Sequence, residues 1–96
     1  MGVTIETPGG SRTIDEREAV RIVEGLRQRA GGVYDPVANP KAAVAAAETI
    51  ERAIESGQVA KIGEADALDA LRQVLEEICR HNAEPEVHDL LTDLRS

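Results

Sequence analysis

Residues 39–54, NPKAAVAAAETIERAI, decide the fold of this chain. Asn39 is a strong N-cap, because its side chain can accept a hydrogen bond from a free backbone N–H of the first helical turn. Pro40 suits the first helical position, where no backbone N–H is needed. The stretch therefore predicts a helix over residues 40–56 that stops at Gly57. Its apolar residues recur at helical spacing and form one face: Ala43, Ala46, Ala47, Ile50, Ala53 and Ile54.

The same periodicity predicts three further helices. The first begins at a capping-box pattern, Thr13 followed by Glu16, in which each side chain would satisfy the other residue's free N–H. A tight connection between the last two helices favours an antiparallel pair. We therefore expect an all-α fold, a four-helix bundle-like domain over residues 14–96. Its helices are expected over residues 15–30, 40–56, 64–81 and 85–94.

The segments outside the helices carry weaker signals. Residues 1–13 hold an alternating, β-branched run and a Pro-Gly-Gly turn, which predict an extended arm. An isolated hairpin is marginal in water, so the arm packs on the helices, pairs with another chain or is disordered. Of these three we favour a flexible arm. Residues 58–62 are expected to form a connector in which Val59 and Ile62 fill the core.

The core is built from small side chains. The chain has 96 residues, 42% of them hydrophobic, with no Phe, no Trp, one Tyr and 14 Ala. Alanine contributes much less transfer energy than leucine or isoleucine, so we expect either a close approach between helices or a second chain to compensate. The Ala-rich face of the helix over 40–56 is then either the closest internal contact or the seam of a homodimer. The candidate seam residues are Ala43, Ala47 and Ile50.

The charge is acidic and unevenly placed. The net charge is −7, and all of it lies in residues 35–96. That balance disfavours nucleic acid and anionic membranes as partners. Without a signal peptide or a long apolar run, a soluble, cytoplasmic protein is expected. Arg17 and Arg21 lie one turn apart and are candidates to engage the acidic half of the same molecule or of a partner protomer.

One loop is a candidate recognition site. Residues 31–39 form the longest irregular stretch between helices, and they hold Tyr34 and Asp35. Tyrosine is favoured in recognition surfaces because its ring offers a large contact area at a low entropy cost. The alternative is that Tyr34 has a structural role only and covers one end of the core.

The chain shows few residues suited to chemistry. Two Glu/His pairs at helical spacing, Glu77 with His81 and Glu84 with His88, could supply two imidazoles and two carboxylates to a metal. Such pairs also arise by chance on charged helices, and a surface role is the alternative. Cys79 is expected to act as a small hydrophobe, buried or half-buried, rather than as a nucleophile.

These observations predict a small acidic non-enzymatic module that binds a protein partner or self-associates as a homodimer. A regulator, an immunity-type inhibitor and an assembly adaptor all fit this description. The alternative is a small-ligand or metal-binding helical protein. Its site would be the junction of the last two helices or the Tyr34 loop. We expect no cofactor, no catalytic residue, no nucleic acid and no membrane partner.

Overall fold

The computed structural model describes residues 2–32, 37 and 39–95. Within these residues the chain forms seven elements. The helices are α1 (Glu16–Ala30), α2 (Pro40–Ser56), α3 (Ala65–His81) and α4 (Pro85–Arg95). The strands are β1 (Gly2–Thr7), β2 (Gly10–Asp15) and β3 (Ala60–Lys61). Each helix begins and ends within one residue of the bounds expected from the sequence.

Local capping explains where the helices begin. Asn39 caps α2 as expected, because its Oδ1 accepts a hydrogen bond from the Ala42 N–H at 3.2 Å. The capping box expected for α1 is wrong. The cap is Asp15, whose Oδ1 accepts from the Arg17 N–H at 2.9 Å. Thr13 lies within β2, where its hydroxyl is 2.9 Å from that of Thr4.

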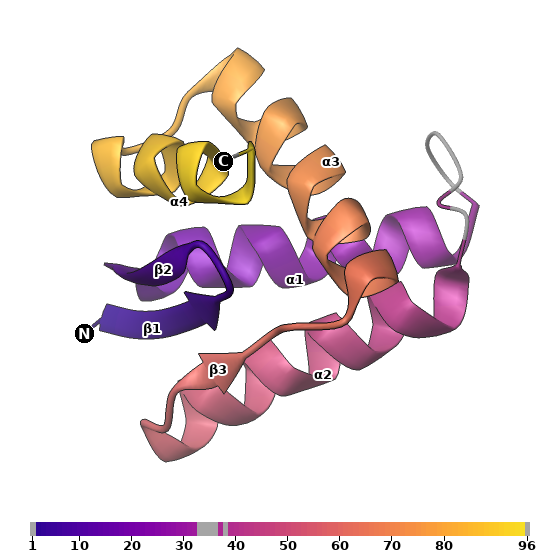
Figure 1. Ribbon diagram of the computed structural model, residues 1–96, viewed down its shortest axis with the longest axis horizontal. Helices are drawn as coiled ribbons and strands as arrows, with labels where there is room; N and C mark the ends of the chain where they lie inside the picture. The colour runs from indigo at the N-terminus through magenta and orange to yellow at the C-terminus, as the bar shows by residue number, and fades with distance from the viewer. Residues whose placement is uncertain (1, 33–36, 38, 96) are drawn as a thin grey trace.

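The expected all-α fold and four-helix bundle are wrong, because the structure contains a three-stranded mixed sheet in the order β2-β1-β3. β1 and β2 form an antiparallel hairpin, which pairs Ile5 with Arg12. β3 runs parallel to β1 and pairs Ala60 with Ile5. Figure 1 shows the hairpin and β3 side by side, with the helices around them. The fold is therefore mixed α/β.

Burial explains why the N-terminal segment is ordered rather than flexible. One face of the hairpin points into the core, where Ile5 is fully buried and Ile14 is 2% exposed. The hairpin contacts α1, α2 and α4, so it gains the apolar contacts that an isolated hairpin lacks. The connector expected over residues 58–62 contains β3. Ile62 is buried there as expected, but Val59 is 45% exposed.

The helices close the core within one chain. α1 and α2 lie side by side, α3 packs against both, and α4 lies beside β2 (Figure 1). The small residues of α2 allow α1 to approach closely. Ala43, Ala47 and Ile50 are fully buried. Of the two roles expected for the Ala-rich face of α2, the structure therefore shows the internal contact. No described helix is both long and apolar enough to cross a bilayer.

A paired arginine and aspartate hold β2 to α4. Arg12 Nε donates to Asp93 Oδ2 at 2.7 Å, and Arg12 Nη2 donates to Oδ1 at 3.1 Å. This hydrogen bonding, together with the guanidinium charge, holds the pKa of the Asp93 carboxyl below its ordinary value of 3.8. Ionised Asp93 therefore favours the folded state.

This pair predicts a pH-dependent stability difference. Asp93→Asn should unfold at lower urea concentration than the original chain at neutral pH. Because the folded-state pKa is lowered, the contribution of Asp93 is present above its unfolded pKa and is lost as the pH falls through the folded value. The difference should therefore shrink below pH of about 4. Asp89→Asn is the control, because the Asp89 carboxylate lies 4.0 Å from Arg12 Nη1, which is too far for a hydrogen bond. Its effect on stability should therefore be smaller than that of Asp93→Asn. If the difference in stability between Asp93→Asn and the original chain were the same at every pH, it would contradict the lowered pKa assigned to Asp93.

Candidate functional site

A groove between α1 and α2, here called the α1–α2 groove, has a volume of about 290 Å³. Its apolar residues are Val20 and Val23 from α1 and Ile54 from α2. Val20 is 41% exposed, and Val59, which does not line the groove, is similarly exposed at 45%. In the part of the chain that the structure describes, these two are the exposed large hydrophobic side chains. The charged residues of the groove are Glu24, Arg27, Glu51 and Glu55.

The groove carries excess negative charge. Arg27 Nη2 donates to Glu51 Oε1, so this ion pair bridges α1 and α2. Three carboxylates and one guanidinium line the groove, which leaves the side chains of Glu24 and Glu55 as its uncompensated charge. Both of these residues are exposed. A cationic partner would therefore be attracted to this surface.

Glu55 lies where its own helix disfavours an acid. It falls in the last turn of α2, which contains no basic residue. The carbonyl end of a helix carries a partial negative charge, so a carboxylate there is destabilising and a cation is favourable. α1 has the favourable arrangement, with acids in its first turn and Arg27 and Arg29 in its last. Violations of such local rules concentrate at functional sites.

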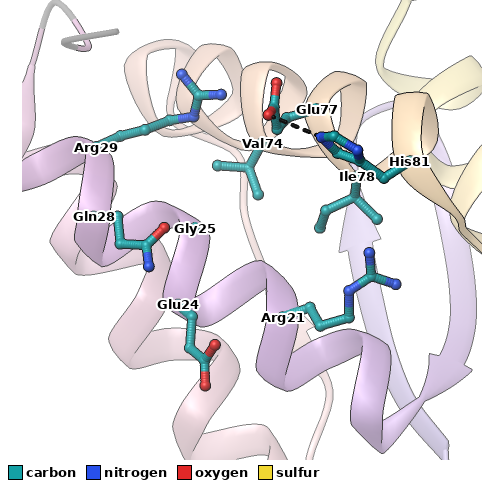
Figure 2. A pocket seen from close by; sticks show the side chains of 9 residues that line it. All are labelled: Arg21, Glu24, Gly25, Gln28, Arg29, Val74, Glu77, Ile78 and His81. Atoms are coloured by element: carbon teal, nitrogen blue, oxygen red, sulfur yellow. Dashed lines mark hydrogen bonds and ion pairs between the residues drawn. The ribbon is translucent and has the colours of Figure 1, made fainter. Parts of the chain in front are cut away.

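A second cavity lies between α1 and α3 and has a volume of about 250 Å³. It brings together three of the residues singled out in the sequence, Arg21, Glu77 and His81. Figure 2 shows Arg21 on α1 facing His81 on α3 across this cavity. The two helices approach closely here, because a Cβ placed on Gly25 would lie 2.7 Å from Val74 Cγ1.

Arg21, Glu77 and His81, which line the α1–α3 cavity, already have partners within the chain. Arg21 Nη1 donates to Glu18 Oε1 at 2.7 Å and to the Asn82 carbonyl oxygen at 2.8 Å. Glu18 is 6% exposed, and its Oε2 accepts from the Glu84 N–H at 3.4 Å. His81 Nε2 lies 3.3 Å from Glu77 Oε1, as the dashed line in Figure 2 marks. Arg21 and Glu18 thus join α1 to the α3–α4 connection.

The two Glu/His pairs do not converge. His88 lines a different cavity, with Cys79 and Arg95, from the one that contains Glu77 and His81. Within the described ranges, no three His, Cys, Asp or Glu side chains are grouped so that they could hold a metal ion. Glu84 contributes its backbone N–H to the contact with Glu18.

Cys79 is half-buried, as the sequence indicates. Burial is the main cause that raises the pKa of its thiol above the ordinary value of 9.0, although the charge of Arg95 opposes the shift. The thiol is therefore protonated at neutral pH, when a nucleophile would need the thiolate. Cys79 packs at the margin of the core as a small hydrophobe.

The other residues singled out in the sequence have separate locations. The proposed seam residues Ala43, Ala47 and Ile50 are inaccessible to a partner chain. Arg17 is exposed near the start of α1. Tyr34 and Asp35 lie outside the described residues, so their proposed recognition role stays a prediction.

Sequence reasoning missed the α1–α2 groove. One signal was available: Val20 is an apolar residue beside, rather than on, the buried stripe of its helix. A second was the absence of a base from the last turn of α2.

Comparison with protein-family models, with curated proteins and with solved structures finds no match.

Proposed function

We propose that this chain is a small, acidic, non-enzymatic module that binds a protein partner through the α1–α2 groove. A regulator, an immunity-type inhibitor or an assembly adaptor would act in this way. The observation that carries the proposal is the groove itself. It exposes Val20 beside Ile54 and retains Glu55 at a helix end where an acid is unfavourable.

The proposed surface differs from the homodimer seam expected from the sequence. That expectation depended on apolar stripes too large for one chain to cover. The described stripes are covered within the monomer, and Ala43, Ala47 and Ile50 are buried. Self-association remains a prediction, but the buried seam residues no longer support it.

Native mass spectrometry of the chain purified gently from its own source tests this function. We expect the 10.3 kDa chain in a stoichiometric complex with another protein. The partner's identity would separate the three kinds of module, because an inhibitor accompanies an enzyme and an adaptor accompanies subunits of an assembly. A bare monomer as the main species would contradict the proposal.

A small-ligand function is the second candidate. It is favoured by the convergence of Arg21, Glu77 and His81 on the α1–α3 cavity. The cavity is smaller than most ligand sites, which span roughly 300–1,000 Å³, so the ligand would be a small polar molecule. The same spectra test it, because a monomer would then carry a defined extra mass. His81→Ala should remove that mass, whereas His88→Ala, in a different cavity, should not.

A further inference from the structure

We infer that the partner presents to the α1–α2 groove an amphipathic helix whose apolar stripe is flanked by Lys or Arg. This inference deepens the proposed function and depends on it. It rests on two properties of the groove, its shape between two antiparallel helices and its excess of carboxylates.

The shape of the groove suits a third helix. α1 and α2 are adjacent and run in opposite directions (Figure 1), with Val20 contributed by one and Ile54 by the other. Rows of side chains on adjacent helices form grooves into which the side chains of another helix pack. An amphipathic helix would bury its apolar stripe against these residues, as in other helix-in-groove complexes. The volume of about 290 Å³ admits only a few side chains of that stripe.

The charges of the groove specify the flanks of that helix. Glu24 lines the groove from α1 and Glu55 lines it from α2, and both are exposed. Because Arg27 is engaged by Glu51, it does not neutralise them. Basic residues on both sides of an apolar stripe would meet both acids. A cation near Glu55 would also interact favourably with the carbonyl end of α2.

A second copy of this chain fits the groove poorly. A two-fold interface brings the same patch of both copies together, so the acidic groove of one copy, with Glu24 and Glu55, would face the acidic groove of the other. The whole chain carries a net charge of −7, which adds to the repulsion. Charge complementarity therefore favours a basic partner over a homodimer.

The test uses a synthetic probe, a helical peptide of Leu and Lys about four turns long, with Leu on one face and Lys beside it. A second peptide carries Glu in place of Lys. A third has the composition of the first but no stripe. Calorimetric titration of the full chain gives each dissociation constant, and amide chemical shifts locate the contact. We expect that, of the three peptides, only the Leu/Lys peptide binds. Binding should change the amide chemical shifts of Val20, Glu24 and Ile54, and the affinity should fall as the salt concentration increases.

Two exposed valines provide a matched pair of variants. Val20→Asp places a charge in the groove, and Val59→Asp makes the same change at a similarly exposed site outside it. Val20→Asp should weaken peptide binding about tenfold or more, because it removes an apolar contact and buries a carboxylate. Val59→Asp should leave the affinity unchanged. Urea unfolding of both variants establishes that each remains folded.

Charge reversal provides an independent pair. Glu55→Lys should weaken binding of the Leu/Lys peptide about fivefold and reduce its dependence on salt. The variant is expected to remain folded, since a base suits the last turn of α2. Glu86→Lys is the control, because Glu86 is exposed in the first turn of α4 and does not line the groove.

The outcomes separate this inference from the proposed function. The inference of a basic helix would be overturned if the Leu/Lys peptide did not bind or if the Glu peptide bound equally well. It would also be overturned if Val20→Asp and Val59→Asp lost the same affinity for the peptide. If the native complex nevertheless forms, the interaction function stands, and only the basic amphipathic helix is rejected as the partner's contact. A homodimer in the native spectra would also overturn the inference while supporting an interaction module. If no complex forms at all, the proposed function fails first.

Discussion

Ile5→Ala should lower the free energy of unfolding by about 2–5 kcal/mol, which is the usual cost of truncating a buried isoleucine. Ile5 is fully buried at the centre of the sheet, where its backbone pairs with both β2 and β3. The loss is large relative to the roughly 5–15 kcal/mol that stabilises a typical domain. Urea denaturation followed by circular dichroism measures it.

The control for Ile5→Ala is Val59→Ala, which shortens a β-branched side chain that is already 45% exposed. It should change stability by about 0.5 kcal/mol or less. Equal midpoints for the two variants would mean that residues 2–7 do not pack on the helices. That result would restore the flexible arm expected from the sequence and contradict the sheet.

Gly9→Ala should destabilise the chain by about 1–3 kcal/mol, the usual range for overpacking. A Cβ on Gly9 would lie 2.2 Å from the carbonyl oxygen of Asp93, which belongs to the backbone of α4. A backbone atom cannot rotate away, so the β1–β2 turn and α4 must separate. Thermal or urea unfolding measures the loss. It should exceed the gain of about 0.4–1 kcal/mol that Gly→Ala gives by restricting the unfolded chain.

Gly63→Ala is the matched control, because among the described residues no atom outside its immediate neighbours lies within 4 Å of a Cβ placed there. We expect its stability to be unchanged or slightly raised. Gly9→Ala should also weaken the pH dependence that Asp93 produces, since moving the turn displaces Arg12 from its partner. A Gly9→Ala variant as stable as Gly63→Ala would show that the turn does not contact α4.

These two variants test the part of the fold that the sequence did not predict. Helix periodicity and local caps depend on residues a few positions apart, so the bounds of α1 to α4 were predicted within one residue. The strands depend on distant partners. β3 has two residues, too few to show alternation, and it forms only because α2 brings it beside β1. The fold class was therefore predicted wrongly although every helix was found.

The candidate site shows the same division. The sequence drew attention to Arg21, Glu77 and His81, and these do share one cavity. It did not relate Glu24 to Glu55, because they lie on different helices whose relative rotation is set by packing. Nor did it show that Ala43 and Ala47 would be covered by their own chain rather than by a second one.

The sequence by itself determined the four helices, their buried stripes and the acidic charge, because each depends on composition or on spacing along a single segment. Only the tertiary structure decided that the N-terminal arm is a hairpin in a mixed sheet, and that Val20 lies in an acidic groove. Both require contacts between segments far apart in the chain. Such contacts are set by how several apolar faces are buried together, which no single segment specifies.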